Sequence, residues 1–223
     1  MRTRSVSLAV VAIMAIHLPM AAQTVHQLPF ASSGNTIELT IANTSSIALS
    51  GVKIEATGVP SWLSFKEIRE TLSLLKANEE MPVLFTFSVD KTAPVQKNQT
   101  LKFVISASTG ERWTKEITVA VAAPERFEAY QNYPNPFNPS TEITYHLPAG
   151  QAGLTVNSRV SLKIYNMLGQ EVASLVDEER AAGYHQERWD ATRFASGVYV
   201  YHHIATVEHG TRQIARKRML LLK

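Results

Sequence analysis

Alternation of apolar and polar residues is the feature that most limits what this chain can fold into. In "TIELTIA" (36–42), Ile37, Leu39 and Ile41 alternate with other residues, as they do in a strand that buries one face. Similar runs follow at short intervals, with turn residues between them, at 50–56, 61–65, 71–75, 82–89, 100–107 and 113–122. About seven short strands in a row are typical of an immunoglobulin-like β-sandwich.

One stretch of the first half leaves a helix open as an alternative. In "KEIRETLSLLKANEE" (66–80), Ile68, Leu72 and Leu75 lie near helical spacing. The neighbouring runs are all strands, so we expect a strand here as well.

The alternation breaks at "AAPERF" (122–127), where a proline and charged residues indicate a domain boundary. Strand-like runs then resume at 141–147, 159–166, 170–176, 183–190, 197–206 and 212–222. The sequence therefore predicts an all-β protein with two small immunoglobulin-like sandwiches in tandem, over residues 24–123 and 124–223.

The first 23 residues have the order of a secretory signal peptide. Arg2 and Arg4 precede an apolar run over 6–16, and small residues follow it. The run is too short to cross a bilayer comfortably, so a retained membrane anchor is the weaker alternative. We expect cleavage after Ala22 or Gln23, which would leave no transmembrane segment in the mature chain.

Charge and cysteine content exclude several function classes. Arg2 and Arg4 supply two of the three formal positive charges, so the mature chain is nearly neutral and has no field to attract nucleic acid. Cysteine is absent, which excludes disulfides, thiolate catalysis and thiolate metal sites. We expect no cofactor.

The second half carries a series of motifs in register. "YPNPFNPSTEITYHLP" (133–148) is followed by "VSLKIYNMLGQEVASLVD" (160–177), then "SGVYVY" (196–201), and the chain ends in "RKRMLLLK" (216–223). In this order the motifs resemble the type A C-terminal sorting domain of the type IX (Por) secretion system, and the resemblance covers about residues 127–223.

The resemblance implies a folded export signal with no chemistry of its own. The outer-membrane type IX translocon is the implied partner, with a sortase and attachment to surface polysaccharide in many relatives. The implied destination is the medium or the outer cell surface, by way of the periplasm. The residues that match the sorting motif are Pro134, Asn135, Pro136, Phe137, Asn138, Pro139, Gly169, Gln170, Gly197, Tyr199, Lys217 and Lys223.

These motifs also have a physical interpretation. The prolines of 134–139 fix φ and keep the segment extended, so that Phe137 can insert at the edge of the sandwich. Asn166 and Gly169 suit turn positions with positive φ in a hairpin. The last strand suits an exposed edge that can pair with another chain.

The pattern of the strand at 197–206 predicts which side chains are buried. We expect Trp189, Val198 and Val200 in the core, with Tyr199 and Tyr201 on the other face.

We find no catalytic or metal-binding motif. His202 and His203 are adjacent on a predicted strand and point to opposite faces, while His146 and His185 have no acidic partner at metal-ligand spacing. No phosphate-binding loop, nucleophile elbow or zinc-protease motif occurs. We expect a protein that is not an enzyme, and a hydrolase is the least favoured alternative.

Two other functions stay open for the first half. Trp62 and Trp113 are candidate platforms for stacking a sugar, although the run around Trp62 favours its burial. An assembly scaffold or adhesin that uses the edges of the first sandwich is the other alternative.

Overall fold

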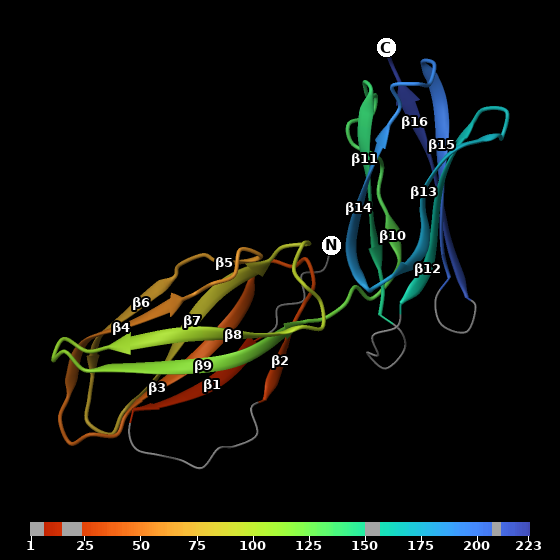
Figure 1. Cartoon of the computed structure of the whole chain (residues 1–223). Coiled ribbons are helices and arrows are strands. Elements are labelled where there is room, and N and C mark those ends of the chain that lie inside the picture. The colour runs from red at the N-terminus through yellow and green to blue at the C-terminus, as the bar shows by residue number, and fades with distance from the viewer. Residues whose placement is uncertain (1–6, 15–23, 150–156, 207–210) are drawn as a thin grey trace. The chain divides into compact units, whose positions relative to one another are not determined.

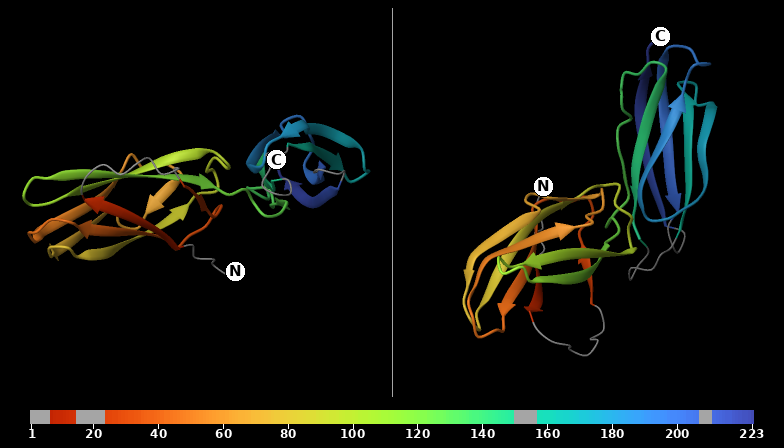
Figure 2. Two further views of the ribbon diagram at one scale, coloured as in Figure 1. Left: turned by 90° about the horizontal axis from the view of Figure 1, so that it is seen from below. Right: turned by 60° about the vertical axis from the view of Figure 1, so that its left-hand side comes forward.

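The computed structural model describes the backbone of residues 7–14 and the whole of residues 24–149, 157–206 and 211–223. These residues form strands, turns and loops and contain no helix, which confirms the all-β prediction. The chain forms two compact units, and the boundary between them lies between Ala122 and Ala123. Each unit is a pair of packed sheets, which Figure 1 and Figure 2 show as two layers of strands.

Unit 1 is built from a four-stranded and a five-stranded sheet. The first has the order β1-β3-β7-β5 and the second the order β2-β9-β8-β4-β6. Two pairs are parallel, β1 with β3 and β2 with β9, and the other pairs are antiparallel. The strands are β1 (Ser7–Met14), β2 (Val25–Leu28), β3 (Asn35–Asn43), β4 (Leu49–Thr57), β5 (Leu63–Phe65), β6 (Arg69–Leu75), β7 (Glu80–Val89), β8 (Asn98–Ser106) and β9 (Arg112–Val121).

The core of unit 1 lies between these sheets and is aliphatic with a cluster of phenylalanines. Ile37, Leu39 and Ile41 of β3 are fully buried, as their alternation predicts. The Phe85 ring packs against Phe103 with centroids 5.2 Å apart. Burying side chains of this size is the main source of stability in a chain that has no disulfide to support it.

The stretch at 66–80 forms a strand and not a helix. Its central part is β6, which pairs antiparallel with β4 from Leu49↔Leu75 to Glu55↔Arg69. Backbone pairing along an existing sheet overrides the weak helical spacing of the apolar residues.

Part of the predicted signal peptide is included in unit 1. Residues 7–14 form β1, which runs parallel to β3 from Ser7↔Thr36 to Met14↔Asn43. The expected cleavage site after Ala22 or Gln23 lies outside the described residues, and so does 150–156 in the loop before β12. The signal peptide therefore stays a prediction.

Unit 2 is built from a three-stranded sheet, β10-β11-β14, and a four-stranded sheet, β13-β12-β15-β16. Every neighbouring pair is antiparallel. The strands are β10 (Glu128–Ala129), β11 (Ser140–Leu147), β12 (Ser158–Asn166), β13 (Glu171–Arg180), β14 (Gly183–Asp190), β15 (Gly197–Thr206) and β16 (Arg212–Leu221).

The core of unit 2 is richer in aromatic rings than that of unit 1. Phe137, Tyr145, Trp189, Tyr201 and His203 are all buried between the two sheets. The Trp189 ring contacts Phe137 with centroids 5.4 Å apart, and Tyr145 contacts His203 at 4.2 Å. Tyrosines can take interior positions when their hydroxyls find partners, and Tyr201 Oη donates to the Tyr130 carbonyl at 2.6 Å.

Among the described residues, none belongs to a helix of the length and hydropathy needed to cross a bilayer.

Candidate functional site

Strand register brings distant segments of unit 2 together at one end. Ser140 of β11 pairs with Asp190 of β14, while Asn166 of β12 pairs with Tyr199 of β15 and Tyr199 with Met219 of β16. The segment before β11, the β12–β13 turn, the β14–β15 loop and the end of β16 therefore meet there. We call this end, which carries the C-terminus in Figure 1, the sorting tip.

Buried hydrogen bonds hold the proline-rich segment of the tip to β11. The Asn132 amide nitrogen, in a residue only 2% exposed, donates to the Pro134 carbonyl at 3.0 Å and to Thr141 Oγ1 at 2.9 Å. Thr141 Oγ1 in turn donates to the same carbonyl at 2.8 Å. Prolines cannot donate from their own nitrogens, so these side chains supply the bonds that fix the segment.

Phe137 joins the proline-rich segment to the last strand. Its ring is buried against Trp189, its N–H donates to the Leu220 carbonyl at 2.9 Å, and Leu222 N–H donates back to its carbonyl at 3.0 Å. Asn135 continues this pairing, because its Oδ1 accepts the Leu220 N–H at 2.9 Å. The segment therefore lies along β16 like a short parallel strand.

This contact corrects part of the expectation for β16. β16 is an edge strand of its sheet. Residues 131–137 nevertheless lie along the outer edge of its last residues, where they bond to the backbone between the Arg218 carbonyl and the Leu222 N–H. Within the described part of the chain, no strand neighbours this outer edge from Arg212 to Lys217. A proline-rich cover of this kind is a common protection for sheet edges.

The C-terminal residue is tied to the β14–β15 loop. Lys223 Nζ donates to the Thr192 carbonyl at 2.6 Å, and its N–H donates to Ser196 Oγ at 3.0 Å. Asp190 shapes the same loop by accepting the N–H of Thr192 at 2.9 Å and also its hydroxyl. The Thr192 hydroxyl and N–H hold the pKa of the Asp190 carboxyl below its usual range.

The β12–β13 turn forms the predicted hairpin, with one correction. Gly169 has the positive φ of 79° that glycine tolerates, but Asn166 does not have a positive φ. Asn166 acts through its side chain, whose Oδ1 accepts the N–H of Leu168 and of Gln170, each at 3.0 Å. Asparagine in this role builds an Asx turn without left-handed backbone.

The predicted faces of β15 are reversed. Tyr199 and Tyr201 are buried in the core, whereas Val198 is 36% exposed and Val200 is half-buried. Trp189 is buried as expected. Both columns of β15 are apolar, so alternation alone could not distinguish them, and the hydroxyls found partners inside: Tyr199 Oη donates to the Ala195 carbonyl at 2.8 Å.

Eleven of the twelve residues predicted from the sorting motif lie at the tip, and Lys217 lies two pairs further along β16, opposite Tyr201. Asn138 is exposed, and Gly197 has the positive φ of 154° where β15 begins. The remaining nine lie in the proline-rich segment, the β12–β13 turn, the start of β15 and the end of the sequence: Pro134, Asn135, Pro136, Phe137, Pro139, Gly169, Gln170, Tyr199 and Lys223.

Sequence reasoning missed several apolar side chains that the tip leaves in solvent. Leu168 is 84% exposed and Tyr133 80%, and Met167 and Leu222 are exposed as well. They lie on three segments of the tip, the proline-rich segment, the β12–β13 turn and the residue after β16, and exposed apolar side chains of this size are candidates for contact with a partner. The sequence did contain a signal for the exposure of Met167 and Leu168, because these two residues are the central positions of the four-residue turn that runs from Asn166 to Gly169.

The histidines of unit 2 pack as aromatic rings. His203 stacks on Phe127 with centroids 5.0 Å apart, and Tyr145 lies between His203 and His185. Burial lowers the pKa of His203 to about 4 and lowers that of His185. No group of three or more potential metal ligands occurs within the described ranges.

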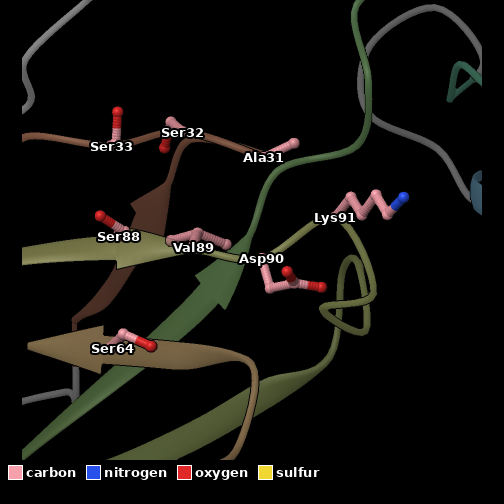
Figure 3. Close-up of a pocket in the computed structure, with 8 residues that line it drawn as sticks. All are labelled: Ala31, Ser32, Ser33, Ser64, Ser88, Val89, Asp90 and Lys91. Carbon is pink, nitrogen blue, oxygen red and sulfur yellow. The ribbon is translucent and has the colours of Figure 1, made fainter.

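A shallow pocket of about 410 Å³ lies in unit 1 (Figure 3). Its Asp90 carboxylate accepts bonds from the N–H and hydroxyl of Thr92, which lower the Asp90 pKa. Ser32 Oγ donates to the Pro29 carbonyl, and no histidine lines the pocket to activate a serine. The lining residues are Ala31, Ser32, Ser33, Ser64, Ser88, Val89, Asp90 and Lys91.

The two tryptophans considered as sugar platforms differ in exposure. Trp62 is 8% exposed and belongs to the core of unit 1, and Trp113 is half-buried against that core. A stacking platform needs an accessible ring face, which Trp62 does not offer.

Comparison with known proteins identifies the family of unit 2. Residues 131–218 match the model of the secretion system C-terminal sorting domain. No curated protein matches the sequence.

Several solved structures are similar to the chain in outline. The CupB2 chaperone of Pseudomonas aeruginosa is 13% identical over 89% of this chain and 99% of that one, with a TM-score of 0.27. Dimeric latent PorU from Porphyromonas gingivalis is 11% identical over 94% of this chain and 20% of that one, with a TM-score of 0.34. The calcium binding domain CBD12 of CALX1.1 is 11% identical, over 82% and 77% of the two chains, with a TM-score of 0.36. These scores are too low to support any conclusion about this chain.

Proposed function

We propose, from the premise that unit 2 is a type IX secretion system C-terminal sorting domain, that the sorting tip is the surface by which the secretion machinery recognises this protein. The family match over residues 131–218 is the observation that carries the proposal. A sorting domain of this family implies export to the outer membrane, the cell surface or the medium, and contact with the type IX machinery.

The chemistry of the tip supports recognition by apolar contact. Tyr133, Met167, Leu168 and Leu222 present large apolar side chains to water, and a partner that covers them gains free energy in proportion to the apolar area removed from solvent. Side-chain bonds from Asn135, Asn166 and Lys223 fix the loops that carry them. A rigid surface loses little conformational entropy on binding.

The route to the translocon completes the proposal. The predicted signal peptide directs the chain across the inner membrane, and the folded unit 2 is then recognised from the periplasm. Removal of unit 2 by a sortase, with attachment of unit 1 to surface polysaccharide, is the further step that such domains undergo in many relatives.

We also propose that the protein is not an enzyme. The serines and the aspartate of the unit 1 pocket have no histidine beside them, and the buried histidines of unit 2 contact aromatic rings instead of a nucleophile. In this proposal unit 1 is the cargo that unit 2 delivers.

Truncation of the last strand tests the proposal. A chain that stops at Lys217 loses the Leu220, Leu222 and Lys223 contacts with the proline-rich segment and the β14–β15 loop. We expect this chain to accumulate in the periplasm of a host with type IX secretion, as measured by fractionation and by protease access to whole cells.

A second variant separates recognition from folding. Leu222 is about half exposed, so Leu222→Ser should leave unit 2 folded while removing part of the apolar surface. Reduced delivery of the folded variant supports the proposal. Normal surface delivery of both the truncated chain and the Leu222→Ser chain would refute it.

A further inference from the structure

We propose that, once residues 1–23 have been removed, the outer edge of β3 binds an extended, uncharged apolar peptide segment as an added parallel strand. The inference rests on the proposed signal-peptide cleavage, because β1 covers this edge in the full-length chain. It concerns unit 1, whose partner the sorting function does not specify.

Hydrogen-bond direction shows which groups cleavage would uncover. Asn43 N–H donates to the Glu79 carbonyl at 2.9 Å, on the side of β7. Because successive N–H groups of a strand point to opposite sides, the other odd residues of β3 also face β7, and Thr36, Glu38 and Thr40 face β1. Loss of β1 therefore removes the strand that the backbone groups on this side of β3, such as those of Glu38 and Thr40, face in the full-length chain.

The β3 edge lacks the devices that usually protect a sheet edge. It is nine residues long and contains no proline, no lysine and a single charged residue, Glu38. The opposite edge of the same sheet is β5, which has only three residues. In the other sheet, edge strand β2 has four residues, and edge strand β6 carries the Arg69–Glu55 ion pair. Among the edge strands that the structure describes in unit 1 after loss of β1, the β3 edge alone is both long and nearly uncharged, which makes it a template for pairing.

The strand that lies on the β3 edge in the full-length chain, β1, indicates what kind of peptide this edge accepts. β1 has the sequence "SLAVVAIM", with eight uncharged and mostly apolar residues, and pairs in parallel along its whole length. Added strands gain affinity from main-chain bonds, which any extended segment can make. A segment of similar composition and direction therefore fits.

Parallel occupancy favours a peptide over a second copy of this chain. Two β3 strands related by the two-fold axis usual in dimers would run antiparallel in a continuous sheet. The edge is occupied here in the parallel direction. A free segment of a partner can enter in that direction without a symmetry constraint.

Amide exchange on the processed chain, residues 24–223, tests the inference. The probe is a synthetic peptide of residues 7–14 with lysines added at both ends for solubility, and NMR follows exchange at single amides. With the peptide at about 100 times its dissociation constant, we expect exchange at Thr36, Glu38 and Thr40 to slow by about 100-fold. Leu39 and Ile41 bond to β7 in both states and serve as internal controls.

Two controls make the result specific to strand addition. A peptide with Val10→Pro and Val11→Pro cannot donate from either position, so it should leave the three amides unprotected. The unprocessed chain should protect the same amides without any peptide, because β1 already covers them.

Three results would overturn the inference. One is unchanged exchange at Thr36, Glu38 and Thr40 with the natural peptide at saturation. Another is protection of these amides in the processed chain alone together with a doubled mass, which would assign the edge to a second copy. The last is equal protection by the proline peptide. None of them depends on delivery to the cell surface, so failure here is separable from failure of the proposed function.

Discussion

The two units share a layout of paired sheets but differ in what fills the space between them. The core of unit 1 combines Ile, Leu and Val side chains with phenylalanines such as Phe85 and Phe103. The core of unit 2 contains Trp189, Tyr145, Tyr201 and the fully buried His203.

One architecture can therefore be stabilised by two kinds of interior that respond differently to acid. The interior of unit 1 contains no titratable side chain among its described core residues, so its packing does not depend directly on pH. The interior of unit 2 contains an imidazole that burial keeps neutral, so its stability depends on pH, and the Tyr201 hydroxyl inside it is bonded to the Tyr130 carbonyl.

Removal of one large ring from each core should destabilise the protein most. Phe85→Ala in unit 1 and Trp189→Ala in unit 2 should each lower the unfolding free energy by about 3–5 kcal/mol, because a cavity adds to the lost burial. Hydrogen exchange by mass spectrometry, read separately for the two units, measures each loss.

Each substitution should destabilise only the unit that carries it, and only Trp189→Ala should reduce delivery to the cell surface. A Phe85→Ala chain that loses unit 2 protection as strongly as unit 1 protection would show that the two cores are not independent.

We expect a lower pH to reduce the stability of unit 2 more than that of unit 1, and this should be the second largest effect. The pKa of His203 is lowered from 6.5 to about 4 in the folded state because burial disfavours its charged form. The unfolded chain then binds a proton that the folded one does not, so stability falls as pH drops below 6.5 and the loss is complete below about 4. At about 1.4 kcal/mol per pH unit, the loss is about 3 kcal/mol.

His185 is shifted in the same direction, and unit 1 has no buried histidine among its described residues. Urea unfolding at pH 7 and pH 5 should therefore show unit 2 weakening more than unit 1. Replacement of His203 by Phe should reduce that difference, and an unchanged pH dependence in the variant would assign it to other groups.

Buried asparagines fix loops in both units, and Asn43 and Asn132 form a matched pair of smaller effect. Asn43 donates to the carbonyls of Ile47, Leu75 and Lys76, and Asn132 donates to Pro134 and Thr141. Asn43→Ala and Asn132→Ala should each cost about 1–3 kcal/mol, since buried acceptors lose their partner. Thermal unfolding measures the cost, and we expect Asn132→Ala alone to impair export.

The smallest effect on stability concerns exposed apolar side chains. Replacing Met167 and Leu168 by Ser should change the unfolding free energy by less than about 0.5 kcal/mol, because both lie in water. Ile47→Ser in unit 1, where Ile47 is also exposed, is the matched control. Surface delivery should fall for the unit 2 variant and stay normal for the control, as scored by whole-cell protease access.

The sequence predicted the strands well, but it predicted poorly the contacts between segments that are far apart in the sequence. Alternation in "TIELTIA" and the Gly169 turn are local signals, and both appear in the structure. The faces of β15 could not be read, because Val and Tyr columns are both apolar and the choice depends on partners such as the carbonyl of Ala195.

The cover over the last strand shows the same limit at the candidate site. Phe137 and Leu220 lie far apart in sequence, and no periodicity predicts that their backbones pair. The sorting motif identified the residues of the tip, but the exposed side chains of Met167 and Leu168 became evident only once the hairpin was in place.

An unrelated cargo fused to unit 2 would show whether this unit is sufficient for export. A secretory leader followed by a monomeric fluorescent protein and residues 123–223 should reach the cell surface or the medium of a host with type IX secretion. The same fusion ending at Lys217 is the control and should stay in the periplasm. Retention of both fusions inside the cell envelope would contradict the claim that unit 2 is an export signal.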